Sequence, residues 1–249
     1  AIRVAIYSLV LGGLTWVVVS AHQVPYQWAW WRFFKDWAPL LFQGLGLTLA
    51  VSAVSMLLAL PLGVVVGLSR ISNDPGARFF GFSYVELFRG TPLLVQVMIW
   101  YHVLAGPLGL SQFGAAVAAL SCFAGSYIAE IVRAGIQSID RGQMEAARSL
   151  GLSHLQAMRH VILPQAFRRI LPPLASEFIA LVKDSSLASV IGLNELTMGT
   201  RAIQSGAYMT FEPWLVTAAL YLVINAILSL GVRLLERKLG TSQRAEVIQ

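Results

Sequence analysis

The sequence predicts an all-α, polytopic membrane protein, and three observations support this fold class. Hydrophobic residues make up 57% of the 249 residues, whereas charged residues make up only 12%, about half the share of an ordinary soluble domain. Residues 37–69, 90–129 and 213–232 contain no Asp, Glu, Lys or Arg. Each stretch can supply a membrane-crossing helix of about 20 apolar residues. A chain with so few polar groups is expected to fold in lipid.

The uncharged stretches and the turn signals between them divide the chain into spans. Gly106-Pro107-Leu108-Gly109 separates two spans, and Asn73-Asp74-Pro75-Gly76 forms another turn. The six expected spans cover residues 2–21, 40–69, 87–105, 113–134, 166–193 and 213–234. The first segment has no basic cluster or cleavage site of a signal peptide, so we interpret it as a span.

The distribution of basic residues predicts that both termini lie in the cytoplasm. With this orientation, outer loops hold Arg32, Lys35 and Arg201, a span holds Lys183, and inner loops hold the remaining 14 of the 18 Lys and Arg residues. Such a bias sets orientation when loops are short. An outer aromatic belt supports it, formed by Tyr26, Trp28, Trp30, Trp31 and Trp37. Because the basic residues alternate between loops, the net charge of +6 does not indicate nucleic-acid binding.

The inner loop from residue 138 to residue 169 contains the clearest local signals. Asp140 followed by Gln143 predicts a helix N-terminus with a capping box. The helix over residues 145–150 is expected to end at Gly151 in a left-handed conformation.

A second short helix is expected to follow in the same loop. Ser153 and Gln156 predict another capping box, and this helix should end at Pro164. The two helices would form a compact knuckle in the cytoplasm, with Ala146 and Ala147 as a small face that a partner can approach closely. The alternative is a stabilised connector that binds no partner.

The knuckle resembles the EAA signature of ATP-binding cassette (ABC) importer permeases. The matching pattern is Glu145-Ala146-Ala147, three residues, Gly151, nine residues, Val161, one residue, and Leu163-Pro164; isoleucine is usual at the position of Val161. In that family the segment is the coupling helix, which docks in a cleft of the ATP-binding subunit. The resemblance implies a coupling role for Glu145, Ala146, Ala147, Gly151, Leu163 and Pro164.

Two further stretches are similar to the histidine/glutamate/glutamine/arginine permease subfamily of these importers. They are residues 86–96, ELFRGTPLLVQ, and residues 183–192, KDSSLASVIG. The resemblance extends over residues 40–240 and implies a permease domain with a five-span core. Residues 1–39 would add a sixth span and an outer loop, and residues 241–249 would form a cytoplasmic tail.

The same resemblance implies the partners, substrate class and location. Such permeases lie in the bacterial inner membrane and pair with a second permease, either an identical copy or a sister subunit. They work with two cytoplasmic ATP-binding subunits and an external substrate-binding protein, and they import polar amino acids.

The residues of this chain exclude the common way of holding ATP. A phosphate-binding loop needs a lysine that follows a glycine. Lys35, Lys183 and Lys238 are the only lysines, and none of them does. We therefore expect no cofactor and no catalytic residue here, and place ATP–Mg in a separate ATPase subunit. His154 and His160 have no metal-ligand spacing to another His or Cys, so we expect no metal site.

Polar groups inside the apolar spans are the candidates for a substrate path. Intramembrane charges are costly and usually face a partner or a wet cavity, and helix breaks supply backbone contacts in transporters. The candidates are Leu93, Leu94 and Gln96 after the Gly90-Thr91-Pro92 bend, Ser126 and Tyr127 on the fourth span, and Glu177, Lys183, Asp184, Ser185 and Ser186 on the fifth. The alternative for the charged residues is a structural ion-pair network between spans.

Other residues are interpreted structurally. Glu130 is expected to pair with Arg133 at the inner end of its span. Gly63 and Gly67 form a small-xxx-small pair that predicts close helix packing. Pro172-Pro173 is expected to kink or interrupt the fifth span.

Three alternative functions differ in how well they fit the sequence. A secondary transporter would need no docking site for an ATPase, so the knuckle argues against it. A membrane-embedded hydrolase needs a nucleophile–base pair or a metal cluster, and neither pattern occurs here. An ABC permease for another small polar solute, such as an opine or a small sulfur compound, is the alternative that keeps the same fold.

Overall fold

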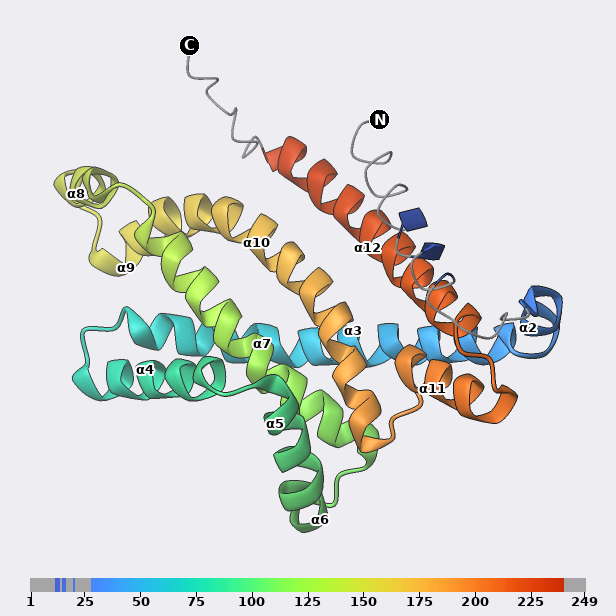
Figure 1. The fold of residues 1–249 in the computed structure, drawn as a ribbon. Helices are drawn as coiled ribbons and strands as arrows, with labels where there is room; N and C mark the ends of the chain where they lie inside the picture. The colour runs from blue at the N-terminus through green and yellow to red at the C-terminus, as the bar shows by residue number, and fades with distance from the viewer. Residues whose placement is uncertain (1–11, 14, 17–19, 21–27, 240–249) are drawn as a thin grey trace.

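The computed structural model describes residues 12–13, 15–16, 20 and 28–239. These residues are helical or in connecting turns, with no strand among them, which confirms the all-α class (Figure 1). The proposed first span, Tyr26 of the aromatic belt and the 241–249 tail lie wholly or largely outside these residues.

The helices follow one another through short connections. Their bounds are α2 Trp30–Asp36, α3 Ala38–Arg70, α4 Pro75–Gly90, α5 Leu93–Ile99, α6 Ala105–Leu108, α7 Gln112–Gln137, α8 Arg141–Ser149, α9 His154–Ala157, α10 Leu163–Asp184, α11 Leu196–Ala207 and α12 Glu212–Leu239. Two π-helical turns, η1 Trp100–Leu104 and η2 Met158–Ile162, and one 3₁₀ helix, η3 Ser185–Ile191, complete the series.

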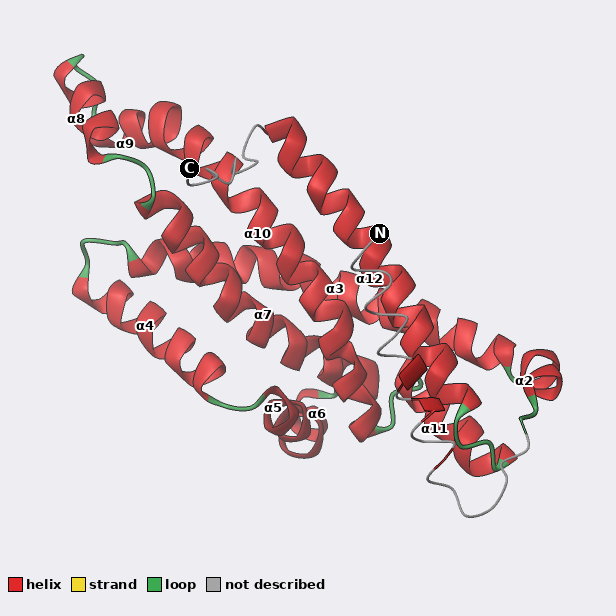
Figure 2. Ribbon diagram, turned by 45° about the horizontal axis from the view of Figure 1, so that its top comes forward, coloured by secondary structure: helices red, strands yellow, loops and turns green. Residues whose placement is uncertain are grey.

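The centre of the structure is the crossing of α3 and α7, which α10 covers (Figure 2). Helix α7 is the most deeply buried of the long apolar helices in the described residues. In its most apolar 18-residue stretch 67% of the residues are buried, against 33% in α3 and 6% in α12. At the opposite end from α8, the Ala29 backbone N–H donates to Glu212 Oε1 at 2.7 Å. This bond fixes the segment before α2 on the first residue of α12.

Glycines allow α3 and α7 to approach closely, as the sequence predicted. A Cβ atom at Gly63 would lie 2.5 Å from Ile128 Cβ, and one at Gly67 would lie 2.7 Å from the Ala129 carbonyl oxygen. In lipid, helices associate through such van der Waals packing because the hydrophobic effect between them is weak. The small-xxx-small prediction is therefore confirmed.

Among the residues that the structure describes, three helices are long and apolar enough to cross a membrane: Ala38–Arg70, Gln112–Gln137 and the Glu212–Arg237 part of α12. A fourth span exists if α4 and the α5–α6 segment are taken together, although they meet at 101°. The multi-pass character is thus confirmed, whereas the count of six stays a prediction.

The expected span over residues 87–105 is wrong as an uninterrupted helix. Helix α4 begins earlier, at Pro75, because the Asp74 carboxylate accepts a hydrogen bond from the Ala77 N–H at 2.6 Å. It ends at Gly90, since Thr91 is extended, with φ −117° and ψ 144°. A residue that precedes proline avoids the helical region, which explains the break at Thr91-Pro92.

The Pro172-Pro173 pair does not interrupt α10, which is continuous from Leu163 to Asp184. The change of helix type comes later, at Ser185, where the 3₁₀ helix η3 begins. Helices that pack among neighbours tolerate proline because the freed backbone groups find other partners. Of the two expected outcomes, a kink or an interruption, the interruption does not occur.

Candidate functional site

The predicted knuckle projects from one end of the structure, where α8 and α9 lie (Figure 1). The Asp140 carboxylate caps α8 by accepting from the Gly142 N–H at 2.7 Å. The expected capping box with Gln143 does not form. Instead, Gln143 Oε1 accepts from Gln165 Nε2 at 3.2 Å, which ties α8 to α10.

The turn between the two short helices has the predicted geometry. Gly151 has φ +85°, in the left-handed region, and its N–H donates to the Arg148 carbonyl at 3.0 Å. Ser153 then caps α9, with its N–H donating to Gln156 Oε1 at 2.8 Å and its hydroxyl accepting from the Gln156 N–H at 3.3 Å. The glycine stop and the second capping box are confirmed.

The second helix does not end at Pro164. Helix α9 continues through η2 into α10, and Pro164 lies in the first turn of α10. The π-helical turn η2 ends at Ile162, directly before Leu163 and this proline. Leu163 and Pro164 are therefore at the base of the knuckle, where its last helix joins α10.

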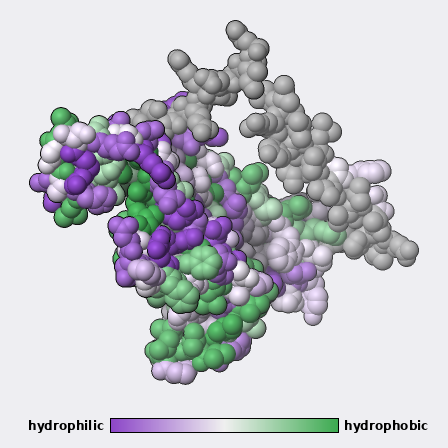
Figure 3. Space-filling model, turned by 90° about the vertical axis from the view of Figure 1, so that its left-hand side faces the viewer, coloured by the Kyte–Doolittle hydropathy of each residue, from purple (hydrophilic) through white to green (hydrophobic). Residues whose placement is uncertain are grey.

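The outer surface of the knuckle carries two exposed leucines that the sequence analysis missed. Leu150 is 84% exposed and Leu155 is 77% exposed, on either side of Gly151. Glu145 and Ala146 are also exposed, whereas Ala147 is buried, so only one alanine of the expected small face is accessible. Figure 3 looks onto this end of the structure: hydrophilic residues dominate its upper and middle parts, and the lowest part is largely hydrophobic.

The Gly90-Thr91-Pro92 bend is held by the buried side chain of Gln96. Its Nε2 donates to the carbonyls of Phe88 and Thr91 at 2.7 and 3.1 Å and to Thr91 Oγ1 at 2.9 Å. These contacts fix the 101° angle between α4 and the α5–α6 segment. Gln96 thus has a structural role, because its hydrogen bonds stabilise the bend.

Beside this bend, arginines from three helices lie close to the Glu130 carboxylate. Arg133 Nη2 donates to Glu130 Oε2 at 2.9 Å, which confirms the predicted pair. Arg70, at the end of α3, contacts Oε1 of the same carboxylate. Arg89 of α4 approaches Oε2 to 3.9 Å. The sequence showed only the i,i+3 partner, because Arg70 and Arg89 are distant along the chain.

The candidates on α5 and α7 differ in their surroundings. Leu93 and Ser126 are buried in the helix packing, and the Ser126 hydroxyl donates to the Phe123 carbonyl at 2.6 Å. Leu94 is exposed. Tyr127 lies under the Arg89 guanidinium, whose carbon is 4.9 Å from the centre of the ring.

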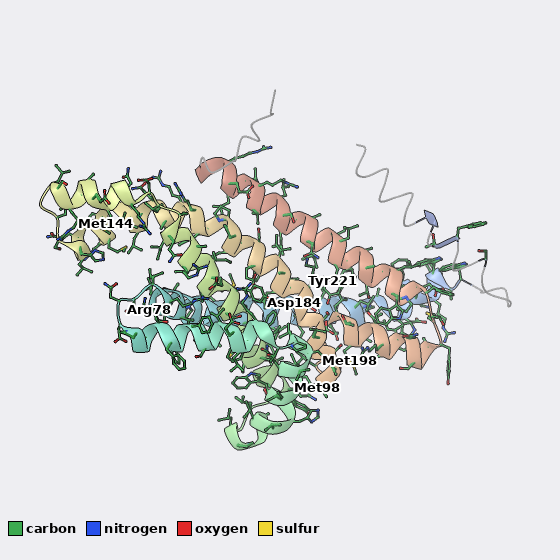
Figure 4. All side chains as sticks on the ribbon, turned by 60° about the vertical axis from the view of Figure 1, so that its left-hand side comes forward. Arg78, Met98, Met144, Asp184, Met198 and Tyr221 are labelled. Atoms are coloured by element: carbon green, nitrogen blue, oxygen red, sulfur yellow. The ribbon has the colours of Figure 1, made fainter. Side chains whose placement is uncertain are left out.

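The candidates on α10 gather near its end. Figure 4 shows Asp184 in the middle of the structure, far from Met144 on α8. Glu177 and Asp184 are half-buried, and the Glu177 carboxylate lies within electrostatic range of Asp184 and Arg89. Within residues 28–239, the side chains of Glu177, Lys183 and Asp184 form no ion pair and no hydrogen bond. These three residues thus form no ion pair with one another here, although Arg89 lies within electrostatic range of Glu177 and Lys183 within range of Asp184.

The two serines that follow have separate surroundings. Ser185 is buried and donates to the Val182 carbonyl at 2.8 Å, while Ser186 is half-buried. Both are in η3, so the change from α to 3₁₀ helix occurs where the sequence placed a candidate break.

A buried carboxylate at the other end of the structure was not predicted. Glu195, between η3 and α11, accepts from the backbone N–H groups of Thr197 and Met198 at 2.9 and 2.8 Å. The hydroxyls of Tyr221 and Thr48 donate to it at 3.2 and 3.4 Å. Burial raises the pKa of the Glu195 carboxyl above its ordinary value, although these hydrogen bonds oppose the shift. The hydrogen bonds of Glu195 thus connect α3, α11 and α12. No local sequence pattern predicts this structural role.

Comparisons with known proteins agree with this geometry. Residues 59–241 match the family described as binding-protein-dependent transport system inner membrane component. The arginine transport system permease protein ArtQ of Bacillus subtilis (strain 168) is 42% identical over 208 residues, which cover 82% of this chain and 94% of that protein. The glutamine transport system permease protein GlnP of Escherichia coli (strain K12) is 39% identical over 213 residues, 82% of this chain and 97% of that protein.

Solved structures show the same fold. A chain in the crystal structure of an amino acid ABC transporter with histidines has a TM-score of 0.81 and 40% identity, covering 86% of this chain and 100% of that one. A chain of the MetNI methionine ABC transporter in an inward-facing conformation has a TM-score of 0.72 at 23% identity, covering 82% of this chain and 98% of that one. The second likeness concerns the fold alone.

Proposed function

Because the chain belongs to the family of binding-protein-dependent transport system inner membrane components, we propose that it is the permease subunit of an ABC importer for polar amino acids. The knuckle is the observation that carries this proposal. Leu150 and Leu155 are more than three-quarters exposed on a segment held rigidly by two capped helices. These two apolar side chains lie on the loop that we place in the cytoplasm, away from the apolar spanning helices, where lipid does not cover them. An ATPase subunit is the partner that ABC transport requires there.

The partners follow from the same proposal. The chain pairs with a second permease, either another copy or a sister subunit, and the knuckle docks on one of two cytoplasmic ATPase subunits, which hold ATP–Mg. An external substrate-binding protein delivers the amino acid. None of the three lysines follows a glycine, so the chain has no phosphate-binding loop of the common type. This supports the assignment of ATP binding to separate subunits.

The substrate path of the proposal runs past the end of α10. Glu177 and Asp184 are half-buried and form no hydrogen bond or ion pair within residues 28–239, so each carboxylate retains the capacity to bind a cation directly. Lys183 is exposed beside them, and opposite charges suit a zwitterion. The arginine and glutamine in the names of the relatives support amino acids as the cargo class.

The proposed organisation divides the chain into three parts. Residues 1–39 form the additional span and outer loop, residues 40–240 the permease domain, and residues 241–249 a tail. Both termini lie on the cytoplasmic side of the bacterial inner membrane, since the basic residues are concentrated in the loops of that side.

The function is tested by ATP hydrolysis of the complex reconstituted with its ATPase and its binding protein. Arginine, histidine, glutamine and glutamate are added one at a time, beside an opine and a small sulfur compound. We expect at least one amino acid to stimulate hydrolysis and none of the other solutes to do so. Stimulation by the opine or the sulfur compound alone would reassign the cargo. Uptake that continues without ATP would show a secondary transporter.

The orientation is tested with single cysteines in a variant whose Cys122 is replaced by serine. Gln112 and Gln143 are both exposed, at the start of α7 and on α8. In whole cells, Gln112→Cys should react with a membrane-impermeant maleimide, whereas Gln143→Cys should react only after the cells are opened. The reverse pattern would contradict the placement of the termini.

A further inference from the structure

An apolar groove lies between α10 and α12, which run side by side (Figure 2). It has a volume of about 180 Å³ and is lined by Ala175, Phe178 and Ile179 of α10 and by four residues of α12 between positions 228 and 235. All seven lining residues are apolar. Sites for compact small molecules enclose about 300–1,000 Å³ and carry a few polar groups. The groove therefore suits a hydrocarbon chain better than a polar solute.

The glycine at position 231 keeps this groove open. Gly231 is exposed on α12, and a Cβ atom built there would meet no heavy atom within 4 Å. Glycine weakens a helix relative to alanine, and close helix packing does not require it here, in contrast to Gly63 and Gly67. The missing side chain leaves space that a ligand from outside the chain can enter.

Arg168 lies on the same face of α10 as the groove. It precedes Ala175 by seven residues, which is two helical turns, in a helix that is continuous from Leu163 to Asp184. Arg168 is exposed, and within residues 28–239 its guanidinium forms no hydrogen bond or ion pair. The adjacent Arg169, by contrast, donates to the Ser138 carbonyl at 2.6 Å. Arg168 thus places an unpaired cation in line with an apolar groove.

This cation lies at the end of the groove that we place in the cytoplasm. Helix α10 begins and α12 ends on the same side of the structure, toward the top of Figure 1. The inner leaflet carries negatively charged phospholipids, which attract basic residues close to the membrane surface. Acyl chains below and phosphates above follow the same order as the groove and Arg168.

We propose that the groove binds an anionic phospholipid of the inner leaflet, with one acyl chain between α10 and α12 and the phosphate on Arg168. A guanidinium can bind phosphate through two parallel hydrogen bonds, and the apolar walls match the chain. The site goes beyond transport of the cargo. It requires only that the chain spans a membrane with α8 on the inner side.

Lipid binding to the detergent-solubilised permease–ATPase complex is measured by native mass spectrometry. The probes are dioleoylphosphatidylglycerol, which is anionic, and dioleoylphosphatidylethanolamine, which is zwitterionic and has the same acyl chains. We expect the anionic lipid to bind about fivefold more tightly, since one basic side chain at an anionic surface contributes an attraction of this size. Equal affinities for the two lipids would overturn the proposal.

The position of the lipid is tested with a phosphatidylglycerol that carries a photoreactive diazirine on one acyl chain. Crosslinks identified by peptide mass spectrometry should fall within residues 175–179 and 228–235, which contain the lining of the groove. Crosslinks at other positions alone would show that the lipid binds elsewhere and would contradict the assignment.

Arg168→Gln tests the contact with the phosphate. We expect it to lower the affinity for phosphatidylglycerol to that for phosphatidylethanolamine. Arg233→Gln is the matched control, because Arg233 is an exposed arginine near the same end of α12 that does not line the groove. It follows Val232 and points to another side of the helix, so its removal should leave both affinities unchanged. An equal loss in the two variants would show general attraction to basic residues and no specific site.

Gly231→Leu tests the groove itself. The leucine should fill the space without a clash, so the unfolding temperature should be kept while the crosslinks and the binding of both lipids are lost. Gly46→Leu is its control, since Gly46 is an exposed glycine of α3 whose Cβ would also meet nothing within 4 Å. Crosslinking that persists in Gly231→Leu would refute the proposal. Separation of the permease pair by Gly231→Leu, with lipid binding unchanged, would instead assign the groove to a second permease.

Discussion

Gly151→Pro should abolish amino-acid-stimulated ATP hydrolysis by the reconstituted complex, while the subunit still inserts into the membrane. Gly151 has φ +85°, which proline cannot adopt because its ring fixes φ near −65°. The substitution also removes the N–H that donates to the Arg148 carbonyl. Because proline cannot keep this backbone conformation, the turn between α8 and α9 should open and the proposed docking surface should be lost.

A surface substitution tests the same docking without disturbing the turn. Leu150→Asp places a charge on the exposed tip of the knuckle and should separate the permease from the ATPase during size-exclusion chromatography. Asn73→Asp is the matched control, because it adds the same charge in the exposed α3–α4 turn. Full stimulation in both Gly151→Pro and Leu150→Asp would show that the knuckle is a connector without a partner.

Glu177→Gln should change which amino acids are transported more than it changes the stability of the complex. The substitution keeps the volume and removes the charge of a half-buried carboxylate that forms no hydrogen bond or ion pair within residues 28–239. Uptake of cationic amino acids should fall about tenfold relative to neutral ones, since a lost contact of about 1.4 kcal/mol changes affinity by that factor. The readouts are reconstituted uptake of cationic, neutral and acidic amino acids and the thermal unfolding temperature of the solubilised complex.

Asp36→Asn is the control for this experiment. It removes a charge from an exposed residue of α2, near Arg32, and should leave both the uptake profile and the unfolding temperature unchanged. A lower unfolding temperature in Glu177→Gln together with an unchanged uptake profile would place Glu177 in the structural framework of the protein instead.

Local signals in the sequence determined the class of the protein and the details of the knuckle. The uncharged stretches predicted the apolar helices α3, α7 and α12, since a bilayer imposes length and apolarity on any helix that crosses it. Gly151 and the Ser153–Gln156 capping box were also predictable. These features depend on backbone geometry and on neighbours within a few residues, which are readable from a single chain.

The sequence was less reliable for breaks and helix ends. Pro92 marked a true bend, whereas Pro172-Pro173 lies inside a continuous α10 and Pro164 lies in its first turn. Proline removes the same donor at each position, so the outcome depends on whether neighbouring helices support the backbone. This information is tertiary.

Only the tertiary structure decided which charged groups meet and which remain unpaired. Arg70, Arg89 and Glu130 lie on three helices, and their contact follows from the packing of α3, α4 and α7. That packing saturates Glu130 and leaves Arg89 with unused donors within range of Glu177. Likewise, the exposure of Leu150 and Leu155, on which the proposed docking surface rests, follows from the fold and could not be read from the sequence. Electrostatic contacts depend on distance in space, and separation along the chain does not report it.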